Sequence, residues 1–246
     1  LGLRKTSHFG TLDPKVTGVL PIALNRACKL TGFFLGEDKE YVGIMSLHEK
    51  VSQEELERIM KDFTGKIKQL PPVRSRVKRQ EREREVKNFE ILETDGKEIL
   101  FKAEVQGGTY IRKLIHDLGE KLGVGAHMLE LRRIRAGIFK EDDEKYPSIN
   151  LYELEKAIKD EKMLRKIIIP GEIVSQIYPV VQIKEESAER ILRGQPIYEK
   201  NLAEKYNFYV ENNVSVFSGD RFIGVFRIVN EGNIFAKPEF VLQPVS

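Results

Sequence analysis

One carboxylate near the start of the chain lies in a loop whose residue types suit chemistry. Asp13 stands between Gly10 and Pro14, and Gly18 ends the loop before an apolar run. Glycine permits a tight turn or a close backbone approach, and proline restricts both its own backbone and that of the preceding residue. Loops of this kind often carry functional sites. An isolated Asp-Pro pair would indicate only a turn, so the interpretation depends on the rest of the chain.

A second stretch places an arginine where a helix begins. Residues 98–105 predict a strand, which runs into a glycine pair and then into a helix with apolar residues at helical spacing. Tyr110 and Arg112 lie at this junction. A cation near a helix N-terminus is unfavourable for the helix dipole unless it serves an anion elsewhere. Asp13 would be such an anion.

A dense run of positive charge follows the prolines at 71 and 72, which prevent regular strand pairing. The cations of this run are Arg74, Arg76, Lys78 and Arg79. The run contains no acid, so we interpret it as a loop that contacts phosphates. Beyond it, basic residues alternate with glutamates over 81–87, and a solvated ribbon explains that part at least as well.

The composition limits the class of protein. A chain of 246 residues with 41% hydrophobic residues can form one large domain or two smaller ones. The formal net charge of +3 does not by itself indicate a nucleic-acid partner. One cysteine, Cys28, excludes an internal disulfide framework and suits a reducing compartment. We find no signal-peptide pattern and no apolar run long enough to span a bilayer, and we expect a cytoplasmic protein.

The remaining pattern predicts a change of architecture along the chain. Strands are expected at 39–47, 86–92, 98–105 and 129–137, with helices starting at Ser52 and spanning 151–168. After the Pro170-Gly171 break, a short helix at 187–192 and short strands at 180–183, 208–210, 214–217, 222–228 and 235–241 predict a small, mostly-β module.

Several stretches resemble the TruB-type pseudouridine synthases. Residues 10–18, Gly-Thr-Leu-Asp-Pro-Lys-Val-Thr-Gly, look like the catalytic loop of that family, and their ending is closest to the archaeal relatives of dyskerin, which act within box H/ACA ribonucleoproteins. Residues 39–41 resemble its Lys-x-Tyr strand, and residues 108–112, Gly-Thr-Tyr-Ile-Arg, resemble its third motif. Residues 131–137, Leu-Arg-Arg followed by a glycine, resemble its fourth.

The resemblance covers most of the chain. Motif order and spacing agree from Ser7 to about Phe139, and the end with Lys184 and Gly194 is similar to a PUA domain. The relatives carry a strand, a helix and a Lys-Pro loop before the catalytic loop, and Phe9 stands where they have a small residue. Because Leu1 is not methionine and the loop follows almost at once, we expect a fragment or an absent upstream stretch, with a processed N-terminus as the alternative.

The implied fold class is α+β. A pseudouridine synthase catalytic domain, with a mixed, mainly antiparallel sheet and flanking helices, is expected at 1–172, with its N-terminal part missing. A PUA-like RNA-binding domain, a small mostly-β barrel, is expected at 173–246.

The resemblance also implies a reaction, in which a uridine within RNA becomes its C-glycoside. Asp13 would be the essential carboxylate, and whether it attacks the sugar, attacks the base or removes a sugar proton stays open. Arg112 would pair with Asp13 and hold it charged. Tyr41 would stack on the target base and handle the C5 proton. Tyr110 would pack beneath the site, and Leu131 would form its wall.

The substrate implied by the resemblance is an RNA whose target base leaves its stack. Residues expected to contact RNA are His8, Arg74, Arg76, Lys78, Arg79 and Lys184. The histidine could equally be structural. The implied partners are guide RNA, target ribosomal RNA or tRNA, and the small core proteins of a box H/ACA ribonucleoprotein. No metal or organic cofactor and no membrane partner are expected.

The sequence leaves three functions open. The first is a guided synthase acting on ribosomal RNA, which the short segment between Leu47 and Pro71 favours. The second is a stand-alone synthase for the tRNA T-loop, and the guided enzyme could share that substrate. The third is a non-catalytic RNA scaffold, against which the presence of Asp13, Tyr41 and Arg112 argues.

Overall fold

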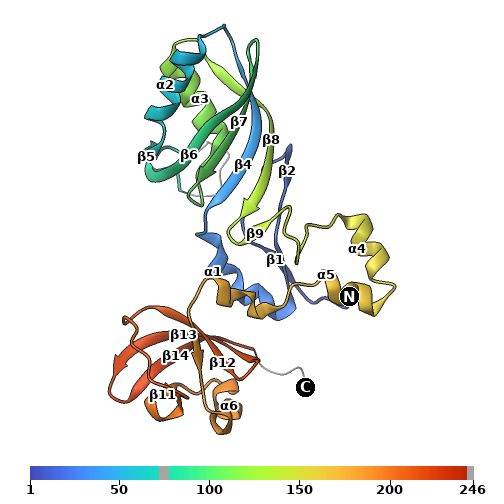
Figure 1. The fold of residues 1–246 in the computed structure, drawn as a ribbon, viewed down its shortest axis with the longest axis vertical. Helices are drawn as coiled ribbons and strands as arrows, with labels where there is room; N and C mark the ends of the chain where they lie inside the picture. The colour runs from blue at the N-terminus through green and yellow to red at the C-terminus, as the bar shows by residue number, and fades with distance from the viewer. Residues whose placement is uncertain (72–77, 243–246) are drawn as a thin grey trace. The chain divides into compact units, whose positions relative to one another are not determined.

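A computed structural model describes residues 1–71 and 78–242, and the chain divides into two compact units (Figure 1). The Asp13 unit comprises Ser7–Ile22 and Phe34–Glu153. The terminal unit comprises Leu1–Thr6, Ala23–Phe33 and the chain from Leu154 onward. The predicted domain boundary between 172 and 173 stays a prediction.

A mixed sheet is the frame of the Asp13 unit. Among the described residues, its strands are β2 (Val16–Gly18), β4 (Lys39–Leu47), β5 (Gly65–Gln69), β6 (Arg82–Asp95), β7 (Glu98–Val105), β8 (Ala126–Ala136) and β9 (Phe139–Lys140). They are arranged in the order β2-β8-β4-β7-β6-β5, with β9 beside β8. Only the β2–β8 pairing is parallel among these neighbours. The prediction of an α+β fold with a mainly antiparallel sheet is confirmed.

Helices α2 (Gln53–Asp62) and α3 (Ile111–Leu122) supply the apolar surface that packs with this sheet. The period-2 pattern of β7 buries Ile99, Phe101 and Val105 in the shared core. As predicted, Ser52 caps α2, because its hydroxyl accepts a hydrogen bond from the Glu55 amide at 3.3 Å. The core therefore fixes the strands from which the candidate site is built.

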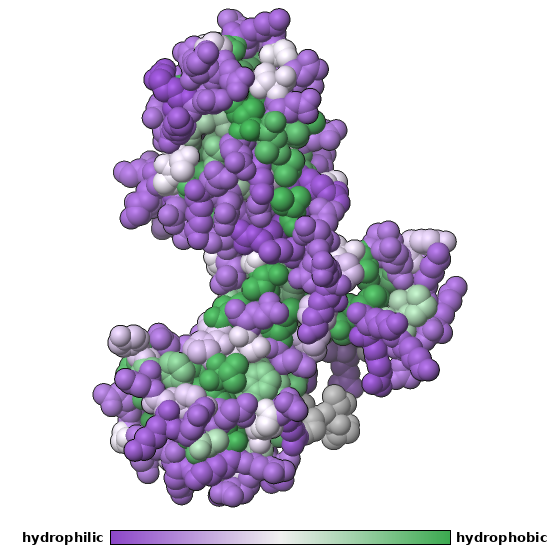
Figure 2. All heavy atoms as spheres, in the orientation of Figure 1, coloured by the Kyte–Doolittle hydropathy of each residue, from purple (hydrophilic) through white to green (hydrophobic). Residues whose placement is uncertain are grey.

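Ion pairs cover other parts of the same sheet. Lys66 pairs with Glu83 at 3.0 Å between β5 and β6, so this part of the charged alternation is a solvated ribbon. On β4, Glu40 pairs with Lys102 of β7 at 2.6 Å and with Arg135 of β8 at 3.2 Å. In Figure 2, hydrophilic side chains dominate the visible surface, with a band of apolar side chains over the sheet.

Short elements lie where the chain passes from one unit to the other. These are β1 (Thr6–His8), β3 (Ile22–Leu24), which pairs with β1, the 3₁₀ segment η1 (Asn25–Leu30), α1 (Thr31–Leu35) and α4 (Leu151–Ala157). The terminal unit then contains α5 (Glu161–Ile167), η2 (Gly171–Gln176), β10 (Val180–Gln182), α6 (Glu185–Leu192), β11 (Ile197–Tyr198), η3 (Glu199–Asn201), β12 (Asn213–Ser218), β13 (Arg221–Glu231) and β14 (Ile234–Val241).

A five-stranded sheet of order β10-β12-β13-β14-β11 dominates the described part of the terminal unit. Val181, Ile191, Val216 and Phe226 lie in its core, so α6 packs with the strands. This agrees with the mostly-β pattern expected for the end of the chain. Among the described residues, no helix is long and apolar enough to cross a membrane.

Two sequence predictions are wrong in this region. The single helix expected over 151–168 is two helices, because the Asp160 carboxylate accepts from the amides of Lys162 and Met163 and so starts a new helix. Residues 208–210 form no strand. There the chain turns instead, and Glu211 adopts a positive φ of 71°.

Gly18 lets β2 lie against β8. Its φ is +98°, and a Cβ at this position would lie 2.1 Å from the carbonyl oxygen of Arg133. The pairing of Gly18 with Arg133 therefore requires a residue without a side chain. Gly65 has nearly the same φ, +96°, but a Cβ there would meet nothing within 4 Å.

We expect Gly18→Ala to destabilise the Asp13 unit more than Gly65→Ala. Both substitutions carry the left-handed backbone cost of about 1–2 kcal/mol, and only Gly18→Ala adds a steric overlap worth about 1–3 kcal/mol. Urea unfolding followed by far-ultraviolet circular dichroism measures both variants. Equal losses of unfolding free energy would contradict the close approach of β2 and β8.

Candidate active site

The structure brings Asp13 and Arg112 together. The Asp13 carboxylate accepts a hydrogen bond from Nη2 of Arg112, although the two residues are 99 positions apart. Their side chains are 44% and 54% exposed, so the pair adds only about 0–1 kcal/mol to stability. Its effect is therefore orientation, since the guanidinium selects one rotamer of the carboxylate. This contact is the one that the unfavourable helix position of Arg112 predicted.

The loop that carries Asp13 is ordered by its own backbone. The amide of Val16 donates to the carbonyl of Asp13 at 3.0 Å, and Lys15 adopts a positive φ of 71°. After this turn, β2 enters the sheet beside β8. The carboxylate thus projects from a turn whose far end is fixed in the sheet.

Tyr41 lies beside this pair. It is partly buried on β4, directly opposite Arg133 of β8. Burial raises the pKa of the Tyr41 phenol; the Arg133 guanidinium lowers that pKa and the negative charge of Asp13 raises it. The net direction is upward, so the phenol keeps its proton at neutral pH. Because both charges act on Tyr41, the tyrosine, the carboxylate and Arg133 belong to one site.

Arg133 is a site residue that the sequence predictions did not single out. Its side chain is only 1% exposed. Nε donates to the carbonyl of Val19 at 2.8 Å, and Nη2 donates to the carbonyl of Gly10 at 3.1 Å. These two carbonyls lie on either side of Asp13 in the chain. One buried guanidinium therefore holds both ends of the candidate loop.

The start of α3 is held by a second contact that the predictions missed. Gln69, at the end of β5, is 3% exposed. Its amide nitrogen donates to the carbonyl of Tyr110 at 3.2 Å, and its amide oxygen accepts from the backbone nitrogen of Tyr110 at 3.0 Å. The Gln69 side chain thus pairs with both backbone groups of Tyr110, the N-cap of α3, as a neighbouring strand would do. Arg112 follows two residues later, so this clamp sets its starting point.

The other predicted site residues are placed as follows. Leu131 is buried on β8 opposite Gly43 of β4, two residues before Arg133. Tyr110 is partly buried at the N-cap of α3. His8 is exposed at the end of β1. Phe9 is buried and stacks on Phe34, with ring centroids 4.7 Å apart, so it anchors the chain just before the loop.

The residues predicted to contact RNA are only partly described. Arg74 and Arg76 lie outside the described residues. Lys78 and Arg79 are exposed, and among residues 1–71 and 78–242 neither has a carboxylate partner. Lys184 belongs to the terminal unit, where it is exposed at the N-cap of α6. Their roles stay predictions.

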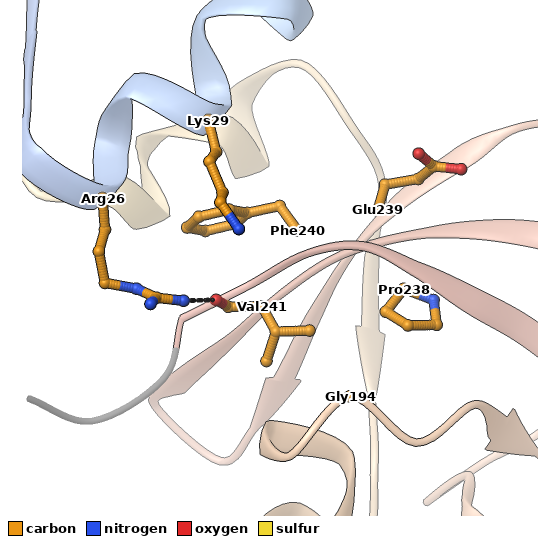
Figure 3. A pocket seen from close by; sticks show the side chains of 7 residues that line it. All are labelled: Arg26, Lys29, Gly194, Pro238, Glu239, Phe240 and Val241. Atoms are coloured by element: carbon orange, nitrogen blue, oxygen red, sulfur yellow. Dashed lines mark hydrogen bonds between the residues drawn. The ribbon is translucent and has the colours of Figure 1, made fainter.

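Two hollows lie outside this group of residues. One, of about 190 Å³, belongs to the terminal unit (Figure 3), where Nη2 of Arg26 donates to the carbonyl of Val241 at 2.8 Å. The other, of about 390 Å³, lies in the Asp13 unit around Glu40 and Arg135, whose charges are paired. Within the described part of the chain, no group of three or more His, Cys, Asp or Glu residues could hold a metal ion.

Comparisons with known proteins identify the family. Residues 1–54 match the N-terminal domain of the TruB family of pseudouridylate synthases, residues 112–175 match the C-terminal domain of tRNA pseudouridylate synthase B, and residues 32–131 match the C-terminal region of Pus10. A probable tRNA pseudouridine synthase B of Archaeoglobus fulgidus is 42% identical over 233 residues, which are 94% of this chain and 69% of that protein. The chain belongs to the TruB family of pseudouridine synthases.

The TruB-family relatives are longer than this chain. A probable tRNA pseudouridine synthase B of Methanocaldococcus jannaschii is 44% identical over 82% of this chain and 61% of that protein. The chain thus spans about three fifths of the length of the first such relatives.

Solved structures support the dyskerin-like branch of the TruB family. A chain in the crystal structure of a Cbf5-Nop10-Gar1 complex matches with a TM-score of 0.87 and 37% identity, covering 98% of this chain and 78% of that one. A chain in an H/ACA ribonucleoprotein bound to a substrate RNA containing 2′-deoxyuridine matches with a TM-score of 0.85 and 35% identity, covering 98% and 77%. The predicted family and branch are confirmed, and the PUA assignment of 173–246 stays a prediction.

We expect Arg133→Met to raise the pKa of Tyr41 further, because the substitution removes the cation that lowers it. Leaving the carbonyls of Gly10 and Val19 without this donor also costs about 2 kcal/mol or more of unfolding free energy. Carbon-13 NMR of labelled tyrosine rings measures the titration, with Tyr41→Phe identifying the signal. An unchanged or lower pKa would show that the guanidinium does not act on the phenol.

Proposed function

We propose that this chain catalyses the isomerisation of uridine to pseudouridine in RNA. The observation that carries this function is the pairing of Asp13 with Arg112 beside Tyr41, on a chain of the TruB family. In the reaction, the bond between N1 of the base and C1′ of the sugar breaks, and a bond between C5 and C1′ forms. C5 then loses its proton, and N1 gains one. The atoms balance without a co-reactant.

Each residue of the group has a role in this chemistry. Asp13 is the reactive carboxylate, held by Arg112 in one orientation. Tyr41, a protonated phenol, stacks on the base and serves the proton transfer at C5. Leu131 supplies an apolar wall, and Tyr110 supports the site from the start of α3. His8 contacts the extruded nucleotide. The base must leave its stack to reach a carboxylate that is partly exposed on a loop.

The favoured substrate is ribosomal RNA held by a box H/ACA guide RNA. Similarity to chains in a Cbf5-Nop10-Gar1 complex and in a substrate-bound H/ACA ribonucleoprotein supports this choice and a partnership with small core proteins. Only α2 and β5 occupy the segment between Leu47 and Pro71, so the described chain offers no long insertion for gripping tRNA. The run from Arg74 to Arg79 and Lys184 would contact RNA phosphates. Residues 173–246 would act as the PUA domain, and the compartment would be the cytoplasm.

A second substrate, the tRNA T-loop, is favoured by the names of the relatives. The proteins of Archaeoglobus fulgidus and Methanocaldococcus jannaschii are both called probable tRNA pseudouridine synthase B. Two reactions separate the substrates: the chain with tRNA alone, and the chain with a ribosomal fragment, a matching guide RNA and the small core proteins. Product only in the second reaction supports guided action. Product in both reactions supports both substrates, and product in neither overturns the proposed activity.

We expect Asp13→Asn to abolish pseudouridine formation and to leave the RNA dissociation constant within about threefold, because the amide keeps the shape of the carboxylate but not its charge. Pseudouridine is counted by chemical labelling, and binding is measured by filter retention. Glu130→Gln, in the same unit, is the matched carboxylate control and should keep full turnover. Equal losses of turnover and binding in Asp13→Asn would contradict a catalytic role for Asp13.

A further inference from the structure

A second buried cation lies behind the Asp13 loop. Lys39, the first residue of β4, is only 5% exposed. Its Nζ donates to the carbonyl of Leu35 at 3.0 Å and also to the carbonyl of Glu37. A lysine is seldom buried without a carboxylate partner, since removing its charge from water is costly. Within the described residues, no carboxylate lies within ion-pair distance of this ammonium.

The side chain of Lys39 connects three segments of the Asp13 unit. A Cβ on Gly10 would lie 3.8 Å from Cε of Lys39 and 3.7 Å from Nη1 of Arg133, so both side chains lie next to the loop at Gly10. The Nζ atom of Lys39 donates to carbonyls of the turn at 35–37. Gly107 packs on these same carbonyls, because a Cβ there would lie 2.9–3.0 Å from them.

Gly107 lies five residues before Arg112, the partner of Asp13. Its turn leads through Tyr110 to Arg112 at the start of α3. The loop with Asp13 and the turn before Arg112 therefore meet the same small assembly, which consists of the 35–37 turn and the ammonium of Lys39. Loss of this assembly would let the carboxylate and its guanidinium partner move independently.

We propose that Lys39 is a positioning residue for the reaction, which as a buried cation ties the 35–37 turn to the Gly10 backbone and thereby keeps Asp13 and Arg112 in register. This inference rests on the proposed function. Lys39 touches neither the substrate nor the reacting atoms. It acts by donating to the backbone carbonyls of Leu35 and Glu37, and its positive charge strengthens these hydrogen bonds, whereas a methionine of similar length donates none.

The charge of Lys39 is sensitive to pH near neutrality. Burial lowers its pKa to about 8, Arg133 and Arg135 lower it too, and Glu37 and Asp38 act in the opposite direction. The charged form therefore predominates below about pH 8, and the neutral amine predominates above it. Tyr41 does not titrate in this interval, because its pKa is raised above the ordinary tyrosine value.

Kinetics of Lys39→Met and Lys39→Arg test the proposal, with Lys102→Met of the neighbouring strand β7 as the matched control. We expect Lys39→Met to lower kcat on the order of 10-fold or more, as a small misplacement of reacting groups does, with KM and RNA binding little changed. Lys102→Met should keep the wild-type kcat. In the wild type, kcat should fall as pH rises through about 8, whereas Lys39→Arg should keep its kcat up to pH 9 because arginine stays charged.

Amide hydrogen exchange gives a readout that does not depend on turnover. Lys39→Met should speed exchange in peptides covering 7–18 and 105–112, and Lys102→Met should not. Unchanged exchange there, or a wild-type kcat in Lys39→Met, or the same pH profile in Lys39→Arg and wild type, overturns the role of Lys39. If the wild type is inactive but Lys39→Met still speeds exchange in these peptides, the proposed function is overturned. The structural link from Lys39 to the Asp13 loop and the start of α3 is then still supported.

Discussion

The geometry of the candidate site depends on the burial of the Arg133 guanidinium. Burying a cation is tolerated only when its donors are satisfied, and the acceptors here are the backbone carbonyls of Gly10 and Val19. Because these carbonyls flank Asp13, the loop cannot shift without leaving the cation unpaired. Gly18 completes the arrangement, since it allows the loop to rejoin the sheet against the backbone of Arg133 itself.

The residues of the proposed chemistry and the residues that support them differ in exposure for a physical reason. In the proposed reaction a base leaves an RNA stack and needs an open surface, and the Asp13–Arg112 pair is about half exposed. An exposed ion pair of this kind is weak and fluctuates, so it cannot define its own position. The position of the pair is set by buried side chains, since Arg133 holds the Asp13 loop and Gln69 holds the backbone of Tyr110. Hydrogen bonds from buried side chains to backbone atoms thus fix the geometry of the exposed pair.

The site residues that lie in glycine-rich loops could be predicted from the sequence, but the buried residues that support them could not. The helix-dipole argument for Arg112 identified its partner correctly, since short local patterns carry that information. The role of Arg133 depends on a bulge between β4 and β8, through which Tyr41 faces Arg133 while Glu40 faces Arg135. In the sequence these two arginines share one strand face, and only the register separates them. The cap at Asp160, which starts α5, was missed for a different reason: apolar periodicity over 151–168 does not show where one helix ends and another begins.

The three arginines of β8 differ in their partners because of this register. Arg132 pairs with Glu141 and Arg135 pairs with Glu40 and Glu104, so their charges are compensated. Among the described residues, Arg133 has carbonyl acceptors and no carboxylate within ion-pair distance, so its charge is not cancelled locally. In a buried setting this charge acts over a longer range than it would in water. It therefore favours negative charge beside Tyr41, which is where the proposed reaction would develop charge on the detached base. The buried cation thus supports the loop mechanically and sets the electrostatic potential of the site with the same side chain.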